Sequence, residues 1–240
     1  MNIHTPLVTP AQLLSKLQEQ FAQHADPHRA VQQQRYMKST MPYWGVKKPI
    51  IDKICAHIFS SARPVDSAAY CATIEYIFTH AQKREEWYAA VIYARKFSDY
   101  ITPAHVCVYI ALILQGQWWD IVDEVAVHLV GKALRESPQM PDQVRSWITH
   151  ENIWIQRTAL LVQLTYKKQT DFVLLTELIM HVAHKKEFFI RKAIGWVLRE
   201  YSKTNPVAVH AYITAHTHLL SPLSVREGLR RIVITPQNMQ

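Results

Sequence analysis

Apolar and polar residues follow a helical period along nearly the whole chain. The first helix has a clear start, because Thr9 is a capping residue and Pro10 suits the first helical position. The pattern predicts helices at 11–23, 67–80, 85–100, 103–115, 118–136, 152–166, 170–184, 187–201, 206–217 and 222–234. No stretch combines strand alternation with hairpin turns, so the pattern indicates an all-α fold.

The starts of alternate predicted helices recur at a spacing of 35 residues, at Trp118-Trp119, Ile153-Trp154, Phe188-Phe189 and Leu223-Ser224. Helix pairs of this period are the units of an α-solenoid, in which each pair buries its face on its neighbours. The spacing therefore predicts stacked antiparallel helix pairs with a concave face for an elongated ligand. Because no linker divides the pattern, we expect residues 1–240 to form a single domain.

Composition agrees with this fold and adds an electrostatic preference. Apolar residues make up 49% of the 240 residues, which excludes a disordered chain, and only 5 are glycine. Lys and Arg number 27 against 19 Asp and Glu, a formal net charge of +8. An excess of this size favours an acidic partner, of which nucleic acid is the commonest.

The cysteines and the N-terminus indicate the cell compartment. Cys55, Cys71 and Cys107 are odd in number and lie in apolar runs, so we expect buried thiols in a reducing compartment. Residues 1–10 lack the basic start and apolar stretch of a signal peptide, and the most apolar run, 106–114, is too short to span a bilayer. We therefore expect a cytoplasmic protein without a membrane partner.

The segment 118–123 (WWDIVD) is the most informative motif. On a helix Trp119 and Asp123 stand one turn apart on the same face. An aromatic face beside an anion suits a flat cation, such as an alkylated, positively charged base. Within a basic chain, this pair predicts a site that meets a polyanion and recognises a positive centre in it.

Aromatic and cationic residues also alternate on the later helices of the repeat. Trp154 precedes Arg157 by three residues, and Lys192, Trp196 and Arg199 form a stripe at i, i+4 and i+7. The alternative is that the tryptophans are core and the charges are solvated, which for any single Trp is correct roughly two times in three. Because the pattern recurs on successive helices, we favour a shared functional face.

Other kinds of site receive little support from the sequence. Two histidine pairs, His181 with His184 and His216 with His218, lack the further ligands of a metal site. The glycines are isolated rather than gathered in a phosphate-binding loop. We therefore expect neither a metal nor a nucleotide cofactor.

Four segments carry a resemblance to a known family: 35–38 (RYMK), 118–123 (WWDIVD), 152–157 (NIWIQR) and, most specifically, 185–201 (KKEFFIRKAIGWVLREY). In these segments, and over nearly its whole length, the chain resembles the AlkD-type DNA alkylation repair glycosylases, bacterial enzymes built from HEAT-like repeats. The resemblance implies hydrolysis of the N-glycosidic bond of positively charged N3- and N7-alkylated purines, without metal or redox cofactor. It also implies a nucleoid-associated, bacterial-type protein.

The resemblance further implies a role for each matching residue. Trp119, Asp123 and Trp196 correspond to the residues that face the lesion, with Asp123 as the carboxylate that stabilises an oxocarbenium-like sugar. The residues expected to contact DNA are Arg157, Arg199, Lys192 and Tyr36. The partner is then duplex DNA containing alkylated purines, and we expect a monomer.

Two alternatives from other functional classes remain. One is a non-catalytic DNA-binding member of the same fold, whose mark would be the loss of Asp123, which is present here. The other is a protein-binding α-solenoid, a common use of such repeats. The excess of positive charge and the aromatic–cation stripe argue against the second alternative.

Overall fold

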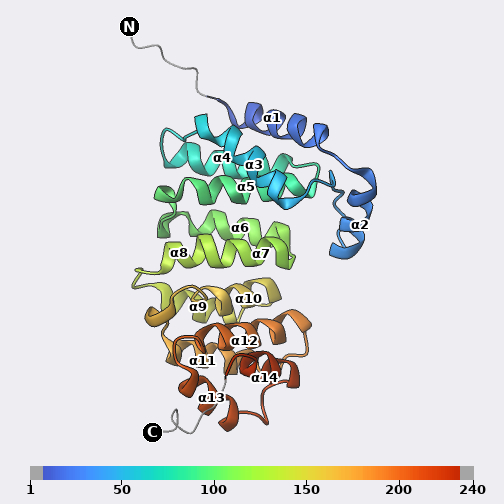
Figure 1. Cartoon of the computed structure of the whole chain (residues 1–240). Helices are drawn as coiled ribbons and strands as arrows, with labels where there is room; N and C mark the ends of the chain where they lie inside the picture. The colour runs from blue at the N-terminus through green and yellow to red at the C-terminus, as the bar shows by residue number, and fades with distance from the viewer. Residues whose placement is uncertain (1–7, 233–240) are drawn as a thin grey trace. The chain divides into compact units, whose positions relative to one another are not determined.

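The computed structural model describes residues 8–232, and every regular element in that range is a helix (Figure 1). The predicted all-α fold is thereby confirmed. The chain divides into two compact units, Met1–Ile101 and Thr102–Gln240. The single domain over residues 1–240 and the concave face both stay predictions.

The first unit is a cluster of helices around one apolar core. Its α-helices are α1 (Pro10–Gln23), α2 (Pro27–Met37), α3 (Lys48–Ile58), α4 (Ser67–His80) and α5 (Arg84–Lys96). Helices α1, α3, α4 and α5 pack on one another, and Leu17, Phe21 and Tyr70 are completely buried. The predicted start of α1 is confirmed, because the Thr9 hydroxyl accepts the Gln12 N–H while the Gln12 side chain accepts the Thr9 N–H.

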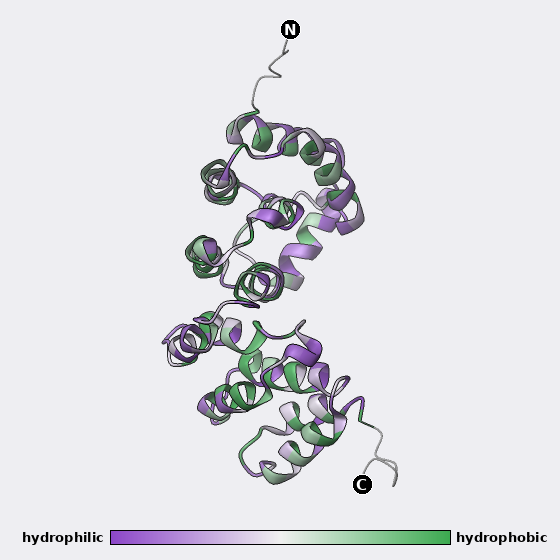
Figure 2. Cartoon of the chain, turned by 90° about the vertical axis from the view of Figure 1, so that its left-hand side faces the viewer, coloured by the Kyte–Doolittle hydropathy of each residue, from purple (hydrophilic) through white to green (hydrophobic). Residues whose placement is uncertain are grey.

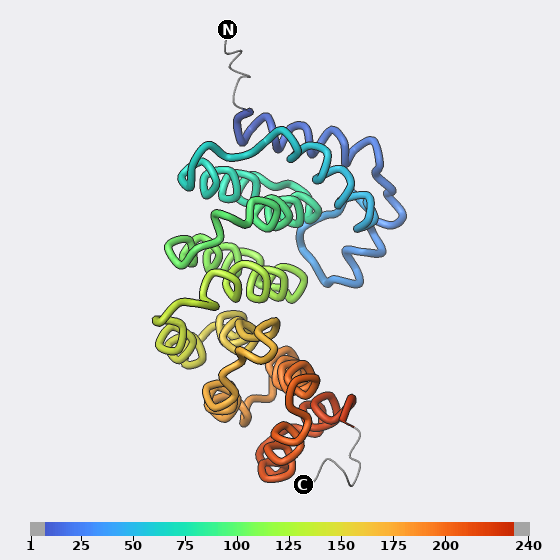
Figure 3. Tube along the Cα trace, turned by 60° about the vertical axis from the view of Figure 1, so that its left-hand side comes forward, coloured from blue at the N-terminus to red at the C-terminus, as the bar shows by residue number. Residues whose placement is uncertain are grey.

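The second unit repeats a helix pair along the chain (Figure 3). Its α-helices are α6 (Val106–Gly116), α7 (Trp119–Val125), α8 (Gly131–Leu134), α9 (Met140–Ile148), α10 (Ile153–Leu161), α11 (Phe172–Val182), α12 (Phe188–Tyr201), α13 (Pro206–Ala215) and α14 (Pro222–Leu229). Helix α7 packs on α10, α10 on α12, and α12 on α14. These four helices begin within one residue of the predicted 35-residue spacing, so the predicted starts are confirmed.

Three helices, α2, α3 and α9, are missing from the sequence prediction. Helix α2 is mainly polar and buries only Met37 among its eleven residues, so few apolar residues mark it. Its start depends instead on Asp26, whose carboxylate accepts the Arg29 N–H, and on Pro27 at the first helical position. Most helices of both units carry hydrophobic and hydrophilic residues together (Figure 2). Helices α3 and α9 are among those with a buried apolar face, at Ile51, Ile54 and Ile58 and at Met140, Val144 and Ile148, so the apolar period does contain a signal for these two.

The helix predicted at 118–136 is interrupted rather than continuous. Helix α7 passes into a π-helical turn at Ala126–Val130, and α8 follows it. A Cβ at Gly131 would lie 2.5 Å from the Val162 carbonyl oxygen, so glycine permits a close approach of two backbones. The Tyr166 hydroxyl donates to the Gly131 carbonyl at 2.7 Å. The apolar period alone contains no sign of this wider turn.

Two further predictions concern the cysteines and the last helix. All three thiols are free, but only Cys55 is buried. Cys71 is partly exposed and Cys107 is exposed, so the prediction of buried thiols is wrong for these two. Cys107 lies on helix α6, which is apolar on nearly every side, so its sequence does not show which face meets solvent.

Helix α14 ends at Leu229, and positions 233–234 of its predicted range lie outside the described residues. Between residues 8 and 232, no helix has both the length and the apolar character needed to cross a bilayer.

Candidate functional site

Asp123 and Arg157 form a buried, bidentate ion pair in the second unit. The Arg157 Nε donates to one carboxylate oxygen of Asp123 at 2.7 Å, and Nη2 donates to the other at 2.8 Å. The third nitrogen, Nη1, donates to the backbone carbonyl of Phe189. The exposed fractions of the two side chains are 15% for Asp123 and 5% for Arg157. One guanidinium thus joins α7, α10 and the start of α12.

The environment of Asp123 acts on its acidity in two opposing directions. Burial raises the pKa of the Asp123 carboxyl, and the nearby acidic residues Asp120 and Glu124 add to the rise. Hydrogen bonding and charge attraction from Arg157 act the other way. The resulting pKa lies above the ordinary aspartate value, because removal from water outweighs the single cation. Such a shift in a partly exposed carboxyl is typical of functional sites.

Three aromatic side chains form a cluster next to Arg157. The ring centroid of Phe189 lies 5.2 Å from that of Trp118 and 4.9 Å from that of Trp154. The Arg157 guanidinium carbon lies 5.9 Å from the centre of the Phe189 ring. Trp154 is buried, so at this position the interpretation of the tryptophan as core is the correct one. The cluster thus meets the ion pair at Arg157, through the ring of Phe189.

Trp119 and Asp123 occupy one face of α7, four residues apart, and both are partly exposed. Trp119 is the first residue of α7, directly after Trp118. Asp120 has a local role at the same helix start, where its carboxylate accepts the Ile121 N–H at 3.0 Å. The aromatic face and the carboxylate predicted to lie together are therefore on the same helix face, and Asp120 is engaged with the backbone.

Lys192 and Arg199 share a carboxylate that is not among the predicted site residues. The Lys192 ammonium lies 3.0 Å from one oxygen of Glu227, and the Arg199 guanidinium donates to the other. Trp196 lies between the two cations on the same face of α12 and is partly exposed. Glu227 stands 35 residues after Lys192, so the repeat spacing is the signal that could have identified it.

Tyr36 belongs to α2 in the first unit, whereas the other candidate site residues belong to the second. Its side chain is prominent, with 77% of the residue exposed. An exposed tyrosine near the end of a helix rich in Gln and Arg is accessible to an external ligand. Its assignment to DNA binding stays a prediction.

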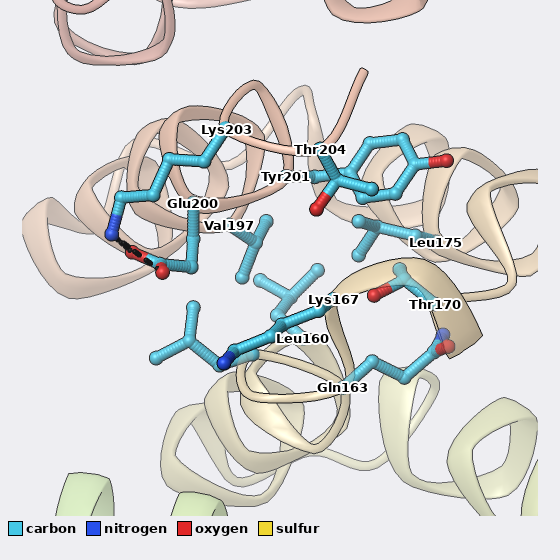
Figure 4. A pocket seen from close by; sticks show the side chains of 11 residues that line it. Leu160, Gln163, Lys167, Thr170, Leu175, Val197, Glu200, Tyr201, Lys203 and Thr204 are labelled. Atoms are coloured by element: carbon cyan, nitrogen blue, oxygen red, sulfur yellow. Dashed lines mark hydrogen bonds and ion pairs between the residues drawn. The ribbon is translucent and has the colours of Figure 1, made fainter.

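A separate pocket of about 160 Å³ lies between α10 and α12 in the second unit (Figure 4). It is lined by Leu160, Gln163, Leu164, Lys167, Thr170, Leu175, Val197, Glu200, Tyr201, Lys203 and Thr204. The lining residues of α12 lie about a third of a turn from the Lys192–Trp196–Arg199 face. None of the predicted site residues lines this pocket, so it is a separate feature of α12.

Within residues 8–232, no three His, Cys, Asp or Glu side chains gather in a way that could hold a metal ion.

Comparisons with known proteins show the family to which the chain belongs. The chain matches the family described as "DNA alkylation repair enzyme" over residues 17–232. Among solved structures it is similar to a "Predicted DNA alkylation repair enzyme from Enterococcus faecalis", with 30% sequence identity and a TM-score of 0.80 over 88% of this chain and 98% of that chain. No curated protein matches the chain. Since the family match spans most of the sequence, the chain belongs to the DNA alkylation repair enzyme family.

Proposed function

We propose that this protein is a DNA glycosylase that hydrolyses the N-glycosidic bond of N3- and N7-alkylated purines in duplex DNA. The observation that carries the proposal is the Asp123–Arg157 ion pair, which fixes a carboxylate at a protected yet partly accessible position. The family supports DNA repair, and the net charge of +8 supports a polyanionic substrate.

The chemistry needs one well-placed anion rather than a general acid. An alkylated purine already carries a positive charge and is a good leaving group, so the remaining barrier is the oxocarbenium-like sugar. Arg157 uses two of the lone-pair positions on the Asp123 carboxylate, and the others stay available to a sugar or a water molecule. A fixed carboxylate in a site with little water stabilises developing positive charge most strongly.

The remaining candidate residues have two kinds of role: some recognise the lesion nucleotide, and others bind the DNA backbone. Trp119, on the Asp123 face of α7, and Trp196 on α12 offer partly exposed aromatic surfaces for cation–π contact with the lesion nucleotide. Lys192 and Arg199 provide positive charge for phosphates. We assign Arg157 first to positioning Asp123, because three of its five N–H groups are directed at Asp123 and Phe189.

Release of a modified base tests the proposal directly. Purified protein, mixed in excess with duplex DNA containing one N7-methylguanine, is expected to release that base and leave an abasic site. The chemical loss of N7-methylguanine without protein is subtracted, and an unmodified duplex serves as the control. Binding of the duplex without release above that background would instead support a non-catalytic DNA-binding protein.

The rate of this release is expected to fall on acidification. The active form of Asp123 is the carboxylate, and its raised pKa means that protonation begins at a higher pH than for an ordinary aspartate. The single-turnover rate should therefore decrease as pH falls toward that pKa and level off above it. A rate that stays constant down to the ordinary aspartate range, with folding retained, would contradict a catalytic carboxylate at Asp123.

A further inference from the structure

We propose that Glu227 is an internal counter-ion for Lys192 and Arg199. By pairing with both cations before DNA arrives, it limits how tightly the protein binds undamaged DNA. The inference rests on the proposed function, because it requires DNA phosphates as the competing anions. It assigns to Glu227 a role in specificity that is separate from the chemistry at Asp123.

The geometry around Glu227 is that of one anion between two cations. Its two oxygens contact Lys192 and Arg199 individually, although these residues lie seven positions apart on α12. The carboxylate therefore draws both long side chains inward over one face of the helix. Together, Lys192, Arg199 and Glu227 carry one net positive charge, whereas Lys192 and Arg199 without Glu227 would carry two.

Glu227 is the least exposed of the three side chains, since Arg199 is 21% exposed and Lys192 more so. A Cβ at Gly195 would lie 2.5 Å from the Glu227 Cβ, so glycine is what lets α14 approach α12 this closely. The Ser224 hydroxyl, one turn earlier on α14, donates to the Arg191 carbonyl at 2.9 Å. The exposed fractions of the side chains are 11% for Glu227 and 40% for Lys192. The carboxylate is therefore fixed, whereas the lysine can turn toward solvent.

The charge state of Glu227 fits this role. Hydrogen bonding to Lys192, followed by attraction from Lys192 and Arg199, lowers the pKa of the Glu227 carboxyl. The group is consequently ionised at neutral pH, and each cation already has an anionic partner before DNA arrives. A phosphate must compete with Glu227 for these cations, which weakens binding that relies on phosphates alone.

The test compares Glu227→Gln with wild type for binding to an undamaged duplex over a range of salt concentrations. Removing the internal anion should tighten binding about 3- to 10-fold at low salt and steepen the plot of log K against log salt by about 0.9, one extra phosphate. Glu177→Gln is the matched control, since it also removes one negative charge and releases Arg145 from a bidentate contact elsewhere in the unit. That control is expected to change the slope much less.

Several outcomes separate this inference from the proposed function. Unchanged or weaker binding by a folded Glu227→Gln variant overturns the role of Glu227, as does an equal effect of Glu177→Gln. Thermal unfolding checks the fold, and Glu227→Met supplies an uncharged side chain of similar size if the buried amide is not tolerated. Wild-type protein that neither binds duplex DNA nor releases N7-methylguanine would contradict the proposed function itself.

Discussion

Asp123→Asn is expected to release N7-methylguanine on the order of 10²-fold more slowly than wild type, a loss of about 2.7 kcal/mol of transition-state stabilisation. Asparagine keeps the shape of the side chain and removes the negative charge that would face the oxocarbenium-like sugar. DNA affinity should change little or rise slightly, because phosphate contacts are unaffected and an anion is lost. Single-turnover measurement with protein in excess isolates the chemical step from binding.

Asp120→Asn is the matched control for this experiment. The two aspartates lie on the same helix, but Asp120 accepts the backbone N–H of Ile121 at the first turn, whereas Asp123 is held by Arg157. The control removes the same charge at nearly the same place and is expected to cost far less activity. Wild-type release by a folded Asp123→Asn variant would refute the catalytic assignment and favour a DNA-binding role without this chemistry.

Arg157→Met is expected to lower the free energy of unfolding by about 3–5 kcal/mol, the usual cost of removing one partner from a buried ion pair. The Asp123 carboxyl would remain partly buried without its cation, and the Phe189 carbonyl would lose its donor. Urea unfolding of the variant at neutral pH measures the loss. The same variant should also release N7-methylguanine slowly, because Asp123 is no longer oriented.

Arg145→Met provides the comparison for stability. Arg145 also makes a bidentate contact, with Glu177, but its side chain is 45% exposed, so the loss should be much smaller. Adding Asp123→Asn to Arg157→Met should recover part of the stability, because no unpaired charge is then left in the site. Equal losses from Arg157→Met and Arg145→Met would show that burial of the Asp123–Arg157 pair has little effect on folding.

The starts of the repeated helices could be predicted from the sequence, whereas contacts between helices could not. The starts of α7, α10, α12 and α14 follow from the 35-residue spacing. Helix α2 is mainly polar, with only Asp26 and Pro27 to mark its start, and the π-helical turn at Ala126–Val130 lies just before Gly131, where two backbones approach closely. The apolar pattern contains no sign of the π-helical turn.

The candidate site shows the same division. The shared face of Trp119 and Asp123 follows from helix geometry and is present in the structure. The partners of the cations could not be predicted from charge alone, because they come from neighbouring repeats: Asp123 for Arg157, and Glu227 for Lys192. Both partners lie about one repeat length away, so the spacing contained a signal that charge alone did not.

The three hydrogen bonds of Arg157 determine at which stage of folding the site takes its final geometry. Repeat proteins can nucleate in one place and extend one unit at a time, and intermediates with only some repeats folded are a natural product of that process. Arg157 on α10 requires α7 on one side and the first turn of α12 on the other. The full set of contacts that orients the Asp123 carboxylate therefore forms only after α7, α10 and α12 have packed together. A chain with fewer repeats in place has the residues of the site but not its geometry.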